Sequence, residues 1–327
     1  MGRDAFGQQE LPVYDDHAPL DDASAAVVAQ ASGTQPAKWW TQDIETSRRE
    51  YAEMVTMLGL PVSGLADRTM ILIEAASDRM LPLHIYRPND RAADCAILFM
   101  RGSGMCMGNM GLYHAILERL AHYSNALVVA PEYRLSPEHQ YPAGHDDAYT
   151  AFEWMVDSAA ALGVDPDNLV LAGDSAGGML AVATAMRARK EHPKAFALQI
   201  LVAPALGTRP ESFSVLSYGD GYLLDTEDLA WLYRTYEGTG KSDDPMIYPI
   251  LAADLSDMPP TFMITAGSDI MRDDAEAFLK QLQRAGVAVE LERFEGTVHP
   301  FLNMGGAIPA CDRALRTIGS RVIDFFG

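Results

Sequence analysis

Short apolar runs alternate with longer amphipathic segments through most of the chain. Runs with the length and composition of buried strands lie near residues 95–100, 126–131, 168–173, 197–203, 260–266 and 288–294. Apolar positions with helical spacing mark residues 112–124, 143–162, 175–190, 271–286 and 307–326. This alternation is typical of a mainly parallel sheet covered by helices on both faces.

Two β-rich runs precede the alternating region. They occupy residues 69–75 and 81–87 and are separated by a polar turn at residues 76–79. That pattern predicts an antiparallel pair at one edge of the sheet. Together with the later runs, it predicts an eight-stranded sheet.

Two further segments do not follow the alternation and are predicted to form a helical cap. A polar, alanine-rich stretch up to about residue 36 and a helical pattern at residues 39–58 come before the sheet. A second helical pattern interrupts the later part of the chain. We therefore predict N-terminal cap helices in residues 1–60 and an α/β domain in residues 61–327, with a second cap insertion at about 212–256.

Composition and charge narrow the range of functions. The 327 residues, 48% of them hydrophobic, can bury a large core. A formal net charge of −20 would repel a phosphate backbone, so nucleic acid is not an expected partner. Three cysteines without a Cys-x-x-Cys pair argue against a disulfide framework and a zinc site. No apolar run is long enough for a signal peptide or a membrane span, so we expect a cytoplasmic protein without a membrane partner.

The strongest chemical signal is a Gly-x-Ser-x-Gly pattern, GDSAG at residues 173–177, between a predicted strand and a predicted helix. This context is the one that a nucleophile elbow requires. Small neighbours let strand and helix approach closely, and Ser175 is then exposed at a helix N-terminus that favours negative charge. In a chain with 26 glycines the bare pattern can arise by chance. Its strand-turn-helix setting makes Ser175 the candidate nucleophile.

A serine nucleophile needs a base, and a histidine base needs a carboxylate that fixes its tautomer. His299 follows the last predicted strand, where a loop can carry it over Ser175. Asp269 follows the strand before it, although Asp273 and Asp274 nearby are equally explained as helix N-terminal carboxylates. The chain order of serine, aspartate and histidine is the order of α/β-hydrolases. We predict a catalytic triad of Ser175, Asp269 and His299.

Charge that develops on an attacked carbonyl oxygen must be met by backbone N–H donors. The residue after the nucleophile and a glycine-rich loop after an earlier strand supply them in this fold. Ala176 occupies the first position, and the loop RGSGMCMG at residues 101–108 occupies the second.

On these motifs, the sequence resembles the bacterial hormone-sensitive-lipase-like esterases, or family IV, of the α/β-hydrolases. The resemblance covers the chain from about residue 81 onward. It rests on GDSAGG at residues 173–178, the loop at 101–108, EYRLSPEH at 132–139 with YPA at 141–143, and DIMRD at 269–273. It implies the same triad and an oxyanion hole formed by the N–H groups of Ser103, Gly104 and Ala176. It also implies hydrolysis of short- to medium-chain esters without cofactor or metal, and a homodimer as a candidate assembly.

The loop departs from the family's usual His-Gly-Gly-Gly, because Arg101 replaces the histidine and Ser103 replaces the second glycine. Arg101 either ties down the loop through its several donors or attracts an anionic substrate, and we favour the first role. A positive φ at Ser103 would strain its backbone. Arg101, Met105 and Asp174 are the candidate pocket residues.

The sequence thus predicts a serine carboxylesterase that acts on a small-molecule ester through an acyl-enzyme. Two alternatives remain open. The same triad serves an amidase, lactonase or carbonate-cleaving enzyme. A ligand-binding protein can also keep this fold without turnover, as the plant gibberellin receptors that resemble this family do.

Overall fold

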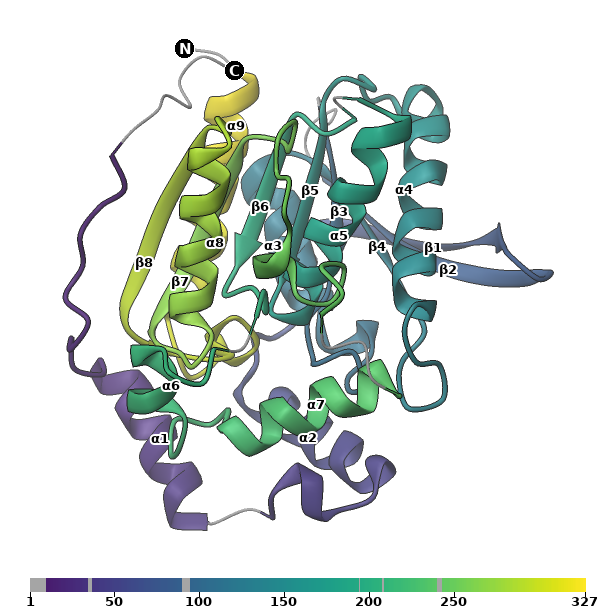
Figure 1. Ribbon diagram of the computed structural model, residues 1–327. Helices are drawn as coiled ribbons and strands as arrows, with labels where there is room; N and C mark the ends of the chain where they lie inside the picture. Colours follow the sequence, from purple (N-terminus) through teal and green to yellow (C-terminus); the bar gives the residue numbers. More distant parts are fainter. Residues whose placement is uncertain (1–9, 35–36, 90–94, 194, 208, 240–242) are drawn as a thin grey trace.

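The computed structural model describes residues 10–34, 37–89, 95–193, 195–207, 209–239 and 243–327. Within these residues, eight strands form one sheet in the order β1-β2-β4-β3-β5-β6-β7-β8 (Figure 1). Their bounds are β1 Ala66–Ala75, β2 Arg79–Pro88, β3 Ala96–Met100, β4 Leu127–Pro131, β5 Leu169–Asp174, β6 Leu198–Val202, β7 Thr261–Ser268 and β8 Val289–Val298. Strand β2 is antiparallel to both β1 and β4, and every pair from β4 to β8 is parallel. The predicted edge hairpin and the mainly parallel eight-stranded sheet are confirmed.

Helices cover both faces of the sheet. Side chains of α4 (Ala143–Leu162), α5 (Ala176–Glu191) and α8 (Arg272–Arg284) share one apolar cluster with Leu169 and Leu171 of β5. Side chains of α3 (His114–Ser124) and α9 (Ala310–Phe326) share a second cluster with Val170 and Ala172. Because successive residues of a strand point to opposite faces, both faces of β5 are buried. That double burial explains why the strands read as continuous apolar runs without polar alternation.

Four helices lie together at one end of the sheet, and we call them the covering helices (Figure 1). They are α1 (Asp22–Thr34), α2 (Ile44–Leu58), α6 (Phe213–Tyr218) and α7 (Thr226–Glu237). The first two fall within the predicted segment 1–60, and the other two within 212–256. Of these predicted segments, residues 1–9, 35–36 and 240–242 lie outside the described residues.

The helix predicted at residues 39–58 begins later than expected. Trp39–Thr41 is a separate 3-10 turn, and Gln42 is extended. Helix α2 starts at Ile44 because the Asp43 carboxylate accepts a hydrogen bond of 2.9 Å from the backbone N–H of Thr46. Such an N-cap satisfies a donor that the first helical turn leaves open.

Three strands end directly before the predicted triad. Strand β5 ends at Asp174, β7 at Ser268 and β8 at Val298, so Ser175, Asp269 and His299 are each the next residue. A register shift between β7 and β8 pairs Ser268 with Val298. Asp269 and His299 therefore leave the sheet side by side, at the end where the parallel strands stop.

Candidate active site

Ser175 occupies a sharp turn between β5 and α5. Its φ of 52° and ψ of −124° are strained for a residue with a side chain. A Cβ on Gly173 would lie 2.3 Å from the Gly177 carbonyl oxygen, and one on Gly177 would lie 2.0 Å from the Met100 carbonyl oxygen. Only glycine fits at either position, which explains the Gly-x-Ser-x-Gly pattern. The turn leaves Ser175 only 8% exposed, at the N-terminus of α5.

The structure brings the three predicted triad residues into one chain of hydrogen bonds. The Ser175 Oγ lies 3.0 Å from His299 Nε2, and His299 Nδ1 lies 3.0 Å from Asp269 Oδ2. The other Asp269 oxygen accepts a hydrogen bond of 2.9 Å from the Met271 N–H, which fixes the carboxylate plane. With Asp269 accepting from Nδ1–H, Nε2 is left with its lone pair facing the serine hydroxyl.

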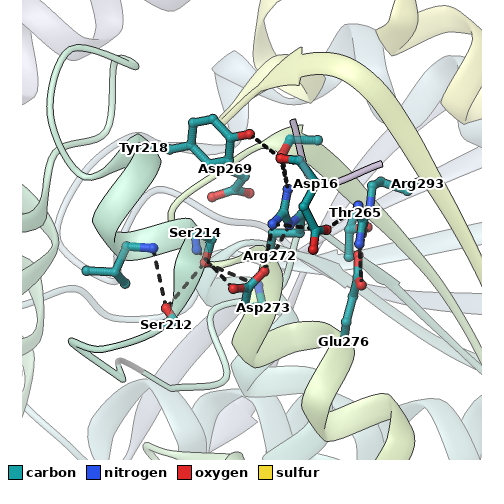
Figure 2. Close-up of polar contacts among 12 residues, drawn as sticks. Asp16, Ser212, Ser214, Tyr218, Thr265, Asp269, Arg272, Asp273, Glu276 and Arg293 are labelled. Atoms are coloured by element: carbon teal, nitrogen blue, oxygen red, sulfur yellow. Dashed lines mark hydrogen bonds and ion pairs between the residues drawn. The ribbon is translucent and has the colours of Figure 1, made fainter. Parts of the chain in front are cut away.

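The loop that carries Asp269 is held by a network of charges (Figure 2). Arg272, 1% exposed, donates to the Gly267 carbonyl at 2.7 Å and pairs with Asp273 at 2.9 Å. Asp16, from the segment before α1, lies 3.4 Å from Arg272 and 2.9 Å from Arg293 of β8. Arg293 also forms a pair of bonds with Glu276 of α8. Each cation in this network has two carboxylate partners.

The predicted oxyanion loop follows β3. Ser103 and Gly104 both have positive φ, 78° and 64°, so the strain expected at Ser103 is present. Within the described residues, the backbone N–H groups of Ser103, Gly104 and Ala176 have no hydrogen-bond partner. All three residues line the same cavity as Ser175. Unpaired N–H groups beside a nucleophile are the donors that an oxyanion requires.

Arg101 anchors this loop from beneath. Its guanidinium is 1% exposed and donates to the carbonyls of Met107 at 2.9 Å, Gly102 at 3.2 Å and Gly108 at 3.4 Å. It also lies over the ring of Tyr133, 4.7 Å from the centroid. Within the described residues, no carboxylate forms an ion pair with Arg101. The loop-anchoring role that the sequence favoured is the one that these contacts support.

Two of the three candidate pocket residues prove to lie elsewhere. Arg101 is directed into the loop, and Asp174 is buried under it, where its carboxylate accepts from the Gly102 N–H and the Tyr113 hydroxyl, each at 2.8 Å. Burial raises the pKa of the Asp174 carboxyl to about 6, although both hydrogen bonds oppose the shift. Neither side chain lines the cavity, whereas Met105 does. Of the three candidate pocket residues, the structure thus places Met105 in the cavity wall, and Arg101 and Asp174 behind the loop.

A cavity of about 760 Å³ opens beside Ser175, between the sheet and three of the covering helices. Its wall is mainly apolar and rich in methionine, including Met54, Met105, Met107, Met179 and Met271. The charged side chains of its wall are Lys38, Glu50, Glu53, Asp225 and Asp228. Carboxylates thus outnumber ammonium groups in the wall, which disfavours an anionic ligand.

Several contacts that shape the site were not predicted from the sequence, although Tyr133 lies in the motif at residues 132–139 that carries the resemblance. Tyr51 of α2 contacts Ser103, with 2.9 Å between the two hydroxyl oxygens. Tyr133 donates to the Arg101 carbonyl at 2.7 Å, and Asp16 reaches the acid loop. A helical or loop residue distant in sequence carries no local pattern that marks such a contact, so these were not predicted.

Two general features of the described residues bear on function. None of the helices there combines the length and the apolar character that crossing a membrane needs. No group of three or more His, Cys, Asp or Glu side chains is placed to hold a metal ion in that part of the chain.

Comparison with known proteins gives a consistent result. A model of the α/β hydrolase fold matches residues 97–303. The chain is 33% identical to the ethyl acetate hydrolase of Pseudomonas putida, over 84% of this chain and 87% of that protein. It is 34% identical to the carboxylesterase NlhH of Mycobacterium tuberculosis, over 72% of this chain and 75% of that protein.

Solved structures agree. A hyperthermophilic esterase from Pyrobaculum calidifontis superimposes with a TM-score of 0.86 at 30% identity, covering 93% of this chain and 98% of that one. An ester hydrolase from the metagenome of Lake Arreo, bound to a bipyridine phosphonate derivative, gives a TM-score of 0.87 at 26% identity, with the same coverage. The chain belongs to the hormone-sensitive-lipase-like, family IV esterases of the α/β-hydrolase superfamily.

Proposed function

We propose that this carboxylesterase hydrolyses short- to medium-chain carboxylic esters, with Ser175 as nucleophile, His299 as general base and Asp269 as its orienting acid. The observation that carries the proposal is the continuous hydrogen-bonded chain from Ser175 Oγ through His299 to Asp269, at the wall of an open cavity. A serine hydroxyl with that partner can attack an acyl carbon near neutral pH.

The first half of the reaction forms an acyl-enzyme. Ser175 Oγ bonds to the ester carbonyl carbon while His299 Nε2 takes the hydroxyl proton, and Asp269 stabilises the imidazolium. The carbonyl oxygen becomes an oxyanion that accepts hydrogen bonds from the N–H groups of Ser103, Gly104 and Ala176. The carbon–oxygen bond to the alcohol then breaks, and His299 returns the proton to the leaving alkoxide.

The second half repeats these steps with water. His299 removes a proton from a water molecule, whose oxygen attacks the acyl carbon. The same donors hold the second oxyanion, at roughly 3 kcal/mol for a single good donor. When the bond to Ser175 Oγ breaks, His299 reprotonates the serine and the carboxylic acid leaves.

The substrate range follows from the cavity. Its volume of about 760 Å³ lies within the range of small-molecule sites. An apolar wall favours an alkyl or aryl group, and its excess of carboxylates favours a neutral or cationic ester over an anionic one. The burial of Arg101 removes the reason to expect an anionic substrate.

The setting we propose is the cytoplasm, with neither nucleic acid nor membrane as a partner. Cys95, Cys106 and Cys311 are buried thiols that form no disulfide, which supports a reducing compartment, and the net charge of −20 supports the exclusion of nucleic acid. A homodimer remains the candidate assembly, on the family resemblance.

Hydrolysis of p-nitrophenyl acetate, butyrate and octanoate by the wild type and by Ser175→Ala, at near-neutral pH, tests the proposal. We expect clear turnover that Ser175→Ala reduces by about 10⁴-fold or more, because nucleophile and base act as a unit. Folded wild-type protein that is inactive on all three esters would overturn the proposal.

A further inference from the structure

The covering helix α2 contacts the oxyanion loop through two side chains one turn apart. Arg48 donates to the Cys106 carbonyl at 2.8 Å and to the Ser136 carbonyl at 2.9 Å, and both oxygens of Glu138 accept from its guanidinium at 2.7 Å. Tyr51 lies on the same side of the helix, since residues three apart share a face. Its hydroxyl reaches Ser103 Oγ at 2.9 Å.

The Tyr51 hydroxyl has one hydrogen-bond partner within the described residues, and it is Ser103. Tyr51 is 4% exposed, and burial raises the pKa of its hydroxyl to about 12, so it keeps its proton at any working pH. A buried hydroxyl that could not donate would lose a bond at a cost of about 1–3 kcal/mol. Either hydroxyl can donate in this contact, and in both arrangements the Tyr51 hydroxyl holds Ser103 Oγ.

The strained backbone of Ser103 must be stabilised by neighbouring groups. A non-glycine residue at positive φ is strained by roughly 1–3 kcal/mol and stays there only where its surroundings fix it. The Ser103 carbonyl accepts from the Met107 N–H at 3.0 Å, which holds the C-terminal side of the residue. On the side chain, the Tyr51 hydroxyl is the group that holds Ser103.

The position of the Ser103 N–H depends on this hydrogen bond between Tyr51 and Ser103. Rotation about φ at Ser103 changes the direction of the side chain relative to the N–H, so a partner bonded to Oγ restrains that rotation. A Cβ added at Gly108 would lie 2.9 Å from Ser103 Oγ, so the loop packs closely around this side chain.

We propose that Tyr51 is a positioning residue for the oxyanion hole, acting through Ser103. The proposal rests on the esterase function proposed above, with Ser103 N–H as an oxyanion donor. A serine at this loop position then needs a hydroxyl from the covering helix, and Tyr51 supplies it. Helix α2 thereby acts on the chemical step as well as on the cavity wall.

A double-mutant cycle tests this. Tyr51→Phe, Ser103→Ala and the double variant are compared with wild type for kcat and KM on p-nitrophenyl butyrate. Tyr51→Phe keeps the aromatic ring and loses only the hydroxyl that contacts Ser103. We expect its kcat to fall by about 10-fold, less than the 10²–10³ of a deleted donor, with KM within about twofold. In the Ser103→Ala background, the same change should lower kcat by less than about twofold, because the contact is already gone.

Tyr86→Phe is the matched control. Tyr86 is as deeply buried, its hydroxyl bonds to His114 at 2.7 Å, and it does not line the cavity. The kcat of Tyr86→Phe should stay at the wild-type value.

Binding of a trifluoromethyl ketone, which forms an oxyanion on Ser175, provides a second readout. Tyr51→Phe should weaken it in proportion to kcat, whereas a purely structural defect would lower the melting temperature without this parallel loss.

Two results would overturn the inference. One is an active wild type with an unchanged kcat in Tyr51→Phe. The other is a Tyr51→Phe effect that is as large without Ser103 Oγ as with it. An inactive wild type would instead contradict the proposed function itself, so the two failures are distinguishable.

Discussion

The two loops that meet at Ser175 are held by different chemistry. The acid loop has Arg272 and Arg293 in a network with Asp16, Asp273 and Glu276, in which each cation has more than one carboxylate (Figure 2). The oxyanion loop has Arg101, which donates to three carbonyls, and uncharged partners such as the Tyr51 and Tyr133 hydroxyls. One loop is held by paired charges, and the other by a buried cation bonded to backbone carbonyls and by hydroxyl groups.

This difference follows from where each loop lies. The acid loop is at the edge of the sheet beside β8. There the Asp16 side chain is about half exposed, so it can form ion pairs while its carboxylate stays partly hydrated. The oxyanion loop follows β3 in the middle of the sheet. A carboxylate there is buried, as Asp174 is, and buried charges carry a large desolvation cost. Carbonyl acceptors stabilise Arg101 without that cost.

Among changes to the residues that hold the two loops, Arg101→Met should have the largest effect. Methionine fills much of the volume but removes the donor to the carbonyls of Met107 and Gly108, and leaves the Gly102 carbonyl with the Tyr133 hydroxyl as its donor. The loop should relax and misplace the Ser103 and Gly104 N–H groups. We predict a fall in kcat of about 10²–10³ on p-nitrophenyl butyrate and a loss of about 3 kcal/mol in the free energy of unfolding. Steady-state kinetics and urea unfolding measure both. An unchanged kcat would mean that the loop does not depend on Arg101.

Arg272→Met is the matched change in the acid loop and should cost less. In this variant Asp16 retains its ion pair with Arg293 at 2.9 Å, and the Asp273 carboxylate still accepts a hydrogen bond of 2.9 Å from the Ser214 N–H. Asp269 also keeps its own bond from the Met271 N–H. We predict a fall in kcat of about 10-fold, because these remaining hydrogen bonds and ion pairs limit the movement of Asp269. The same assay compares the two variants directly. A larger loss in Arg272→Met than in Arg101→Met would reverse the comparison.

The contrast also marks the limit of what the sequence could predict. The sequence could predict that Ser175, Asp269 and His299 lie together, because each follows an apolar strand and the parallel strands bring their ends together. Strand pattern alone placed them correctly beside one another. Arg101 was read as a candidate pocket residue because the direction of a side chain in a loop depends on its three-dimensional neighbours.

The contacts that support the two loops were even harder to predict from the sequence. Asp16 and Tyr51 lie 256 and 52 positions from their partners Arg272 and Ser103. Nothing in the local pattern of residues 10–21 or of helix α2 indicates those contacts. Both depend on how the covering segments pack, which the periodicity of apolar residues does not specify.

Asp174 provides the finest test of how the oxyanion loop is held. Its folded-state pKa of about 6 is above the usual value of 3.8, so the folded protein binds this proton more tightly than the unfolded chain. Its contribution to stability is therefore fully present below about pH 4 and is lost as the pH rises through about 6. Asp174→Asn has no proton to lose. We predict that the difference in unfolding free energy between the variant and the wild type shifts in favour of the variant as the pH rises from 4 to 7.

The amide can keep the local contacts. Its oxygen still accepts from the Gly102 N–H, and the Tyr113 hydroxyl can turn to donate to Asn303 Oδ1, 3.3 Å away. Urea unfolding at pH 4, 5, 6 and 7 measures the shift, with Asp157→Asn, which changes an exposed carboxylate on α4, as the control. A difference that stays constant across this range would show that the Asp174 carboxylate is not destabilised by burial. A shift of the predicted sign would mean that the oxyanion loop is built over a carboxylate whose charge opposes folding, whereas the charges of the acid loop are paired.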